Sequence, residues 1–373
     1  MASTVLGALR QFLPDFLKAA PPLSSEQQRA LWAITHCRTP ALGGRAFACR
    51  PCRQVHFAWH SCNHKACPQC GRAATARWVQ RELAKLVQAP YFLVTFTLPA
   101  QLRGCFFGPL AKLAYDLFFT AVARALSEKL ATDKGLRATV NGFTAALHTW
   151  NQQMGFHPHI HCLVPGAGLD DRGRLVRVKK PDFLVYLPHL QCAFRQHLRD
   201  LLKAHDWQVD PAVWGTDWGV HIRPAGNGAS ALKYLGAYVA RTAISDGRIR
   251  QVSAQAVSFH WKNRDANRQE THTLPGVEFV QRYLHHVLPQ GLRAIRYYGF
   301  CHPTAKSSRL RVQLHTGRCL QFGATTAVTP PPAAVPQCPC CRQPMRLVCT
   351  FLSQYRRRGP PNVGAQFSSS LSA

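Results

Sequence analysis

Residues 157–165 read HPHIHCLVP, and this segment governs how the rest of the chain is interpreted. Its second half is apolar and ends at a proline, so we expect a strand here. Side chains alternate between the two faces of a strand. His157, His159 and His161 therefore share one face, and Ile160 points into the core.

Two imidazoles on one strand make half of a divalent-cation site and leave positions open for a substrate. We expect His159 and His161 to hold Mg²⁺ or Mn²⁺, which would polarise a scissile phosphate, although zinc would also accept these ligands. His157 shares their parity and is a candidate third ligand. Its competitors are His148, Gln152 and Gln153. The alternative is an exposed polar strand face, which three histidines at period two disfavour.

A second motif, KYLGAY over 233–238, lies in a segment with helical periodicity from Ser230 to Arg241. Tyr234 and Tyr238 are four residues apart and share a helix face. Taken alone, this spacing is more typical of core packing. A phenol beside a divalent cation, however, loses its proton more easily and can attack phosphorus.

The residues that flank the tyrosines are basic. Lys233 and Arg241 could bind DNA phosphates, or simply form a solvated helix face.

A cysteine-rich segment precedes these motifs. Cys49-x-x-Cys52 and Cys67-x-x-Cys70 are separated by residues 53–66, a spacing that suits one tetrahedral zinc site. The alternative is a redox pair or buried thiols. Cys37 and Cys62, with two nearby histidines, are candidates for a second zinc ion. The sequence therefore predicts one or two structural zinc ions.

Cysteines also gather near the end of the chain. Cys338, Cys340, Cys341 and Cys349 could form another small site, although their spacing is not a clean double pair. A ligand from elsewhere, such as Cys319, could complete it.

The composition restricts the class of protein. The chain has 373 residues with 46 Lys and Arg against 17 Asp and Glu, a formal charge of +29. This surplus suits a polyanionic partner, and a ribosomal or membrane-surface protein is the alternative. We expect no signal peptide, no membrane span and no nucleotide-binding loop. Clustered cysteine pairs in a cytosolic chain favour metal binding over disulfides.

The motifs together resemble the insertion-sequence-91 family of rolling-circle transposases, which belong to the HUH endonuclease superfamily. The resemblance rests on HTWNQ (148–152), HPHIHCLVPGAGL (157–169) and KYLGAYVARTAIS (233–245). The segments 37–49 and 61–70 look like that family's zinc-binding domain, and 90–99 and 279–300 are also similar. The likeness extends from about residue 20 to residue 349.

The resemblance implies an α+β fold, in which a central antiparallel sheet flanked by helices carries the metal histidines on a middle strand. It assigns His159 and His161 to the cation and Tyr234 and Tyr238 to the nucleophiles. Such enzymes nick single-stranded DNA, stay joined to its 5′ phosphate and need no ATP. The partners would be single-stranded DNA at the ends of a mobile element and at its target, and the enzyme would act in the bacterial cytoplasm at the nucleoid.

Two other functions remain as alternatives, namely a rolling-circle replication initiator and a catalytically dead zinc-finger DNA-binding protein. For a transposase, we expect the zinc module to grip the end of the mobile element through basic residues. The candidates are Arg50, Arg53, Lys65, Arg72 and Arg77.

The expected organisation begins with a helical segment (1–35), a zinc-binding module (36–88) and a catalytic domain (89–300). An extension (301–328), a proline-rich linker (329–336), a small cysteine-containing segment (337–354) and a basic, serine-rich tail (355–373) complete it.

Overall fold

The computed structural model describes residues 4–239, 243–263, 266–317 and 335–353. The side chains of 72–74 and 237–239 lie outside this description. So do most of the expected linker and all of the expected tail.

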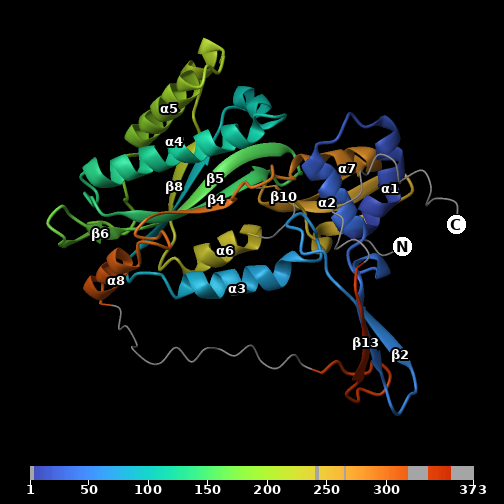
Figure 1. Cartoon of the computed structure of the whole chain (residues 1–373). Helices are drawn as coiled ribbons and strands as arrows, with labels where there is room; N and C mark the ends of the chain where they lie inside the picture. Colours follow the sequence, from blue (N-terminus) through green and yellow to red (C-terminus); the bar gives the residue numbers. More distant parts are fainter. Residues whose placement is uncertain (1–3, 240–242, 264–265, 318–334, 354–373) are drawn as a thin grey trace.

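A five-stranded sheet forms the centre of the molecule (Figure 1), with the order β12-β4-β5-β3-β8 and every pair antiparallel. The histidine strand, β5, is the middle strand. It covers the expected range, and β4 beside it had not been predicted. The bounds are β3 (Tyr91–Thr97), β4 (Gly142–Trp150), β5 (Phe156–Pro165), β8 (Val220–Pro224) and β12 (Ile295–Gly299).

One face of this sheet is covered by α4 (Ala111–Thr132) and α5 (Leu187–Ala204), as Figure 1 shows. Alternation along β5 sends Ile160, Cys162 and Val164 into the core that these helices share with the sheet. The alternate side chains of β5, which include His159 and His161, therefore point to the other face of the sheet.

On that other side lie α3 (Gly71–Leu83) and α6 (Ala229–Val239). Leu232 and Leu235 of α6 pack with Trp78 of α3 and Leu163 of β5 in a separate buried cluster. The helix that carries the tyrosines is thus held against the face of the sheet that carries the histidines. The chain continues near this face into α8 (Lys306–His315).

A second core joins the two N-terminal helices to a later part of the chain. Helix α1 (Val5–Ala19) packs on α7 (Gly276–His285), where Phe12 leaves no room for a side chain at Gly276. A capping box, in which the side chains of Ser24 and Gln27 each accept from the other's backbone N–H, starts α2 (Ser25–Thr35). The remaining strands of this layer are β9 (Ile249–Val252), β10 (Ala256–Asn263) and β11 (Arg268–Pro275), of which β10 and β11 had not been predicted.

A three-stranded sheet projects from the body as an arm (Figure 1). Strands β1 (Gly44–Ala48) and β2 (Val55–Trp59) form a hairpin, and β13 (Arg346–Phe351) pairs with β1. The small C-terminal segment is therefore part of the same sheet as the N-terminal hairpin. We call residues 44–59 together with 337–352 the arm. A short hairpin of β6 (Ala167–Leu169) and β7 (Leu175–Arg177) lies elsewhere on the body.

Within the described part of the chain, no helix is long and apolar enough to cross a membrane.

Candidate active site and metal centres

Three histidines converge on the face of the central sheet that α6 covers. His148 of β4 lies opposite His159 of β5 in the strand register, and His161 follows two residues later on the same face. Their ligand atoms lie within 4.8 Å of one another. This arrangement brings together the two predicted ligands and one of the competitors for the third position.

His157 does not join this cluster, contrary to the first choice made from the sequence. Its Nδ1 accepts a hydrogen bond from Nη2 of Arg103 at 2.9 Å, so a positive charge already lies beside the ring. Burial, and then Arg103, lower the pKa of His157. His148 instead reaches the site across the strand pair, where directly opposed side chains approach closely.

Two of the cluster histidines are held by hydrogen bonds at their Nδ1 atoms. Nδ1 of His159 lies 2.7 Å from the backbone oxygen of His157, and Nδ1 of His161 lies 2.8 Å from Oγ1 of Thr95. The carbonyl contact requires Nδ1 of His159 to carry the hydrogen, and the Thr95 hydroxyl orients the ring of His161. Burial, followed by the charges of His161 and His159, lowers the pKa of His148 well below its usual range, which keeps this ring neutral.

Tyr234 is positioned beside the histidines by α6. Its ring meets the ring of His161 edge to face, with centroids 5.9 Å apart. The side chain keeps 37% of its surface exposed, so it is accessible to a substrate. Tyr238 lies one turn farther along the same helix. Its side chain, like Arg241 as a whole, falls outside the described residues.

Gly236 allows α6 to lie close to α3. A methyl group at this position would collide with Cγ2 of Val79 and approach the ring of Trp78. The glycine inside the tyrosine motif therefore sets the helix packing, a role that the sequence had not indicated.

A groove of about 1220 Å³ runs past the histidines and Tyr234. Gln152 and Gln153 line it without being part of the histidine cluster. The groove is also lined by cationic and aromatic side chains that sequence reasoning missed, because they come from β8, from the turn before β9 and from β10. These are Arg223, Arg248, Trp261 and Lys262.

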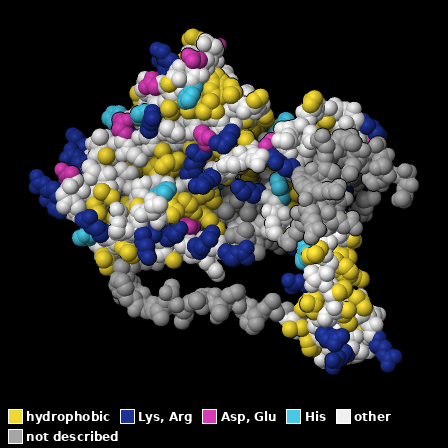
Figure 2. All heavy atoms as spheres, viewed as in Figure 1, with side chains coloured by type: hydrophobic (Ala, Val, Ile, Leu, Met, Phe, Trp, Pro, Cys, Tyr) yellow, Lys and Arg dark blue, Asp and Glu magenta, His cyan; other side chains and the backbone are white. Residues whose placement is uncertain are grey.

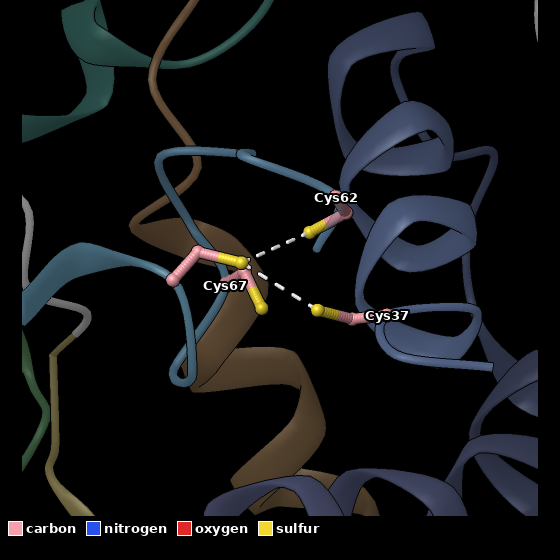
Figure 3. A group of neighbouring side chains, drawn as sticks. Cys37, Cys62 and Cys67 are labelled. Carbon is pink, nitrogen blue, oxygen red and sulfur yellow. Dashed lines mark hydrogen bonds between the residues drawn. The ribbon is translucent and has the colours of Figure 1, made fainter. Parts of the chain in front are cut away.

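Four cysteines meet where α2 ends and α3 begins. Sγ of Cys70 lies 3.5 Å from Sγ of Cys37 and 3.6 Å from Sγ of Cys62, and Cys67 completes the group. Figure 3 shows Cys37, Cys62 and Cys67 pointing toward one another. The thiol of Cys62 and its neighbours donate hydrogen bonds that lower the pKa of Cys67 to about 5. This set is suited to a tetrahedral zinc ion.

A second group of four cysteines lies at the tip of the arm. It consists of Cys49 and Cys52 from the hairpin, with Cys338 and Cys341 from the C-terminal segment. The expected site of Cys49, Cys52, Cys67 and Cys70 is therefore wrong in its grouping. The hairpin of β1 and β2 carries the first pair outward, whereas the second pair stays at the start of α3.

The basic residues predicted to contact DNA are spread over four places. Arg50 and Arg53 are exposed at the tip of the arm, and Arg77 is exposed on α3. Lys65 lines a cavity of about 410 Å³ that shares Trp150 with the groove. Lys233 is exposed on α6. The side chain of Arg72 lies outside the described residues.

Comparison with known proteins agrees with the arrangement of motifs. A family model described as a putative transposase matches residues 142–309, and one described as a transposase zinc-binding domain matches residues 8–98. These ranges contain the histidine strand with the tyrosine helix and the first cysteine group, respectively.

Two curated proteins are similar over most of their length. A putative transposase of Sinorhizobium fredii, y4qJ, is 37% identical over 74% of this chain and 75% of its own. The transposase for insertion sequence element IS801 of Pseudomonas savastanoi pv. phaseolicola is 29% identical over 71% of this chain and 67% of its own. No solved structure matches. The chain therefore belongs to the insertion-sequence-91 family of transposases and carries that family's N-terminal zinc-binding domain.

Proposed function

We propose that this transposase cuts and rejoins single-stranded DNA through a 5′-phosphotyrosine formed on Tyr234, as in rolling-circle transposition. The observation that carries the proposal is the position of Tyr234, whose ring meets His161 within the histidine-lined groove. A tyrosine placed only for packing would be buried, whereas this one is among the exposed large side chains.

The histidines fit a catalytic cation in number and in protonation state. A metal ligand must be neutral imidazole, and the burial of His148 favours that form. With Nδ1 of His159 and His161 held by the protein, Nε2 is the nitrogen that each would offer. We therefore assign His148, His159 and His161 as the ligands of Mg²⁺ or Mn²⁺. When bound, the cation would polarise the scissile phosphate and favour the phenolate.

In the proposed reaction, the phenolate oxygen of Tyr234 attacks phosphorus and forms a new P–O bond. The bond from phosphorus to the 3′ oxygen breaks, and that oxygen takes up a proton to leave a free 3′ hydroxyl. Attack by a 3′ hydroxyl on the phosphotyrosine reverses these changes and joins the strands. The number of phosphodiester bonds is conserved, so no nucleotide cofactor is required.

Tyr238 is the proposed second nucleophile. It follows Tyr234 by four residues on α6, so the two Cα positions share a helix face. Two nucleophiles would let one tyrosine hold a strand end while the other cleaves again. This role rests on the spacing and on the family resemblance.

The groove is chemically suited to single-stranded DNA. It combines Arg223, Arg248 and Lys262 with the indole of Trp261, and single strands bind where cationic side chains alternate with aromatic rings. The fold, with its middle histidine strand and flanking helices, supports assignment to the HUH class of nucleases. Figure 2 shows that Lys and Arg also outnumber acidic residues on the visible face of the body.

The cysteine group at the start of α3 is the proposed structural zinc site that supports the nucleophile. Cys70 is the N-cap residue directly before α3, and α3 packs on α6. Zinc bound by Cys37, Cys62, Cys67 and Cys70 would fix α3 and, through it, the position of Tyr234.

A gel assay for a covalent protein–DNA adduct tests the proposal. Labelled single-stranded ends of the mobile element are incubated with Mn²⁺ and with wild type, Tyr234→Phe, Tyr238→Phe or the double variant. We expect an adduct in wild type and its loss in Tyr234→Phe. An adduct that persists in Tyr234→Phe but disappears in Tyr238→Phe would move the first attack to Tyr238. DNA binding without any adduct in wild type would instead indicate a DNA-binding protein.

A further inference from the structure

We propose that Cys49, Cys52, Cys338 and Cys341 bind one zinc ion and so close the two ends of the chain into a single zinc-ribbon unit. The ligand atoms of these residues lie within 4.8 Å of one another, and Sγ of Cys49 is 3.5 Å from Sγ of Cys341. The transposase zinc-binding model ends at residue 98, so half of this site lies beyond it. The assignment does not depend on the nuclease reaction.

The two halves of the site have matching backbone geometry. The N–H of Cys49 donates to the oxygen of Gln54 at 3.0 Å, and the N–H of Cys338 donates to the oxygen of Gln343 at 2.9 Å. In each half the donor and acceptor are five residues apart. The residue after the second cysteine has positive φ in both, 55° for Arg53 and 58° for Arg342.

This repetition indicates two equivalent turns built to present paired thiolates. A non-glycine residue with positive φ is uncommon, so its occurrence at the same place in both halves is not a consequence of chance packing. Both turns are followed by a strand, β2 after the first and β13 after the second. Two such turns and a three-stranded antiparallel sheet can surround one tetrahedral ion.

The arm has too little buried apolar surface to hold itself together. Its core consists of Phe47 and Met345 with Cys49 and Cys338, and all six residues of β13 are exposed. A small unit with so little burial needs a metal or a disulfide. Four thiols whose sulfur atoms all lie within 4.8 Å of one another favour the metal, since the free energy of metal binding then becomes folding free energy.

A competing group must be weighed against this assignment. His56 and Cys340 lie close to Cys338, and Nε2 of His56 is 3.7 Å from its sulfur. Cys340, however, is exposed and lies between the two cysteines of its turn, with its sulfur 3.5 Å from Oε1 of Gln54. Cys341 holds the place equivalent to Cys52, so we assign Cys341 as the ligand and His56 as a neighbour of the sulfur of Cys338.

The consequence is a tether that does not depend on the intervening chain. The site joins Cys52 to Cys338, and β13 pairs along β1. The C-terminal segment should therefore stay attached to the N-terminal hairpin even after the peptide backbone between them is cut.

Cobalt substitution of the full-length protein tests the ligands. Thiolate-to-cobalt charge-transfer absorption reports cysteine sites and is silent for the histidine cluster. We expect Cys341→Ser to lose about half of this absorption and Cys67→Ser to lose the other half. Cys340→Ser, the adjacent matched control, should keep all of it. Full absorption in Cys341→Ser, or an equal loss in Cys340→Ser, would overturn the assignment.

A second experiment remains informative if a variant folds poorly in the arm. A protease site is placed between residues 318 and 334, and the cut protein is run on size exclusion under native conditions. The C-terminal fragment should co-elute with the body in wild type and in Cys340→Ser. It should separate in Cys341→Ser and after strong chelation. A fragment that separates from wild type in the presence of zinc would contradict the tether.

Discussion

His148 and His159 lie directly opposite each other on antiparallel β4 and β5, with their ring centroids 5.1 Å apart. This cross-strand relationship supplies the third imidazole that HPHIH alone does not contain. His161 approaches His148 more closely, at 4.5 Å between centroids. The three rings form a triangle on one face of the sheet, with Tyr234 at its border.

Replacing His148 by Ala should remove a cation ligand without changing the two others. Loss of a hydrogen-bond partner behind a ligand costs about 10–100-fold in metal affinity, so loss of the ligand itself should cost at least that. Adduct yield measured against Mn²⁺ concentration gives the affinity. His157→Ala is the control and should shift the curve by only a few-fold. An equal effect of both changes would return His157 to the site.

Thr95→Val tests whether the protein orients His161. In the tautomer that presents Nε2 to a cation, Nδ1–H of His161 donates to Oγ1 of Thr95 at 2.8 Å. Valine keeps the shape and removes the acceptor. We expect the Mn²⁺ concentration needed for half-maximal adduct formation to rise about 10–100-fold. The rate at saturating Mn²⁺ should stay nearly normal. A lowered maximal rate with unchanged Mn²⁺ dependence would assign Thr95 a different role.

The sequence was sufficient for features that depend on local periodicity. The histidine strand and the tyrosine helix each follow from residues close in the chain. His148 was only one of several candidates, because its selection requires the register between β4 and β5. The basic side chains that line the groove were missed because they come from separate elements that meet only in the folded chain.

The cysteine pairing shows the same limit more sharply. Two Cys-x-x-Cys pairs at a favourable spacing predicted one site, since sequence distance was the only available guide. In the structure the hairpin separates these pairs, and Cys52 instead meets Cys338. Ligands so far apart in the chain cannot be paired from sequence spacing. The Cys-x-x-Cys pairs are nevertheless sufficient to predict that zinc is bound.

Gly236→Ala should destabilise the protein despite the better helix propensity of alanine. Propensity favours alanine by about 1 kcal/mol, but overpacking against Val79 and Trp78 costs about 1–3 kcal/mol. Adduct formation should fall as well, because α6 carries Tyr234.

The double variant Gly236→Ala with Val79→Ala should recover part of the lost stability, since it removes the colliding methyl group. Gly104→Ala, where a methyl group would meet no neighbour within 4 Å, serves as the control. Urea denaturation provides the measurement. No recovery in the double variant would exclude steric contact with Val79 as the cause.

His286 should make the protein less stable in mild acid. Burial lowers its pKa to about 3, and the neutral ring bonds Thr149 and Met154. The unfolded chain has the usual histidine pKa of about 6.5 and takes up a proton that the folded state excludes. Stability is therefore present above about pH 6.5 and falls as the pH drops toward 3.

The contribution of His286 should be on the order of a few kcal/mol across this range. His286→Gln should be less stable than wild type at pH 7, yet lose less stability on going to pH 4.5. Denaturation at both pH values measures the difference. His205→Gln, at an exposed histidine outside these contacts, is the control and should retain the wild-type slope. Equal slopes for all three proteins would contradict the assignment.

The arm should bind single-stranded DNA through its aromatic face. Phe57 stacks on Trp59 with ring centroids 5.1 Å apart and planes at 4°, and Phe351 joins them from β13. Phe57 is 53% exposed and Phe351 40% exposed, so the face is open. The arm carries no Asp or Glu. Its five arginines, all exposed, are Arg45, Arg50, Arg53, Arg342 and Arg346.

Phe57→Ala should weaken binding of a single-stranded oligonucleotide by about 5–150-fold, since stacking contributes about 1–3 kcal/mol per base. Zinc content should not change, because Phe57 lies outside both cysteine groups. Tyr186→Ala removes an aromatic ring that is 51% exposed on the body and should leave affinity unchanged. Fluorescence anisotropy at fixed salt measures the affinity of wild type, of these two variants and of Arg50→Ala. If Phe57→Ala binds as wild type does while Arg50→Ala does not, the arm contacts phosphates alone and the aromatic face serves another purpose.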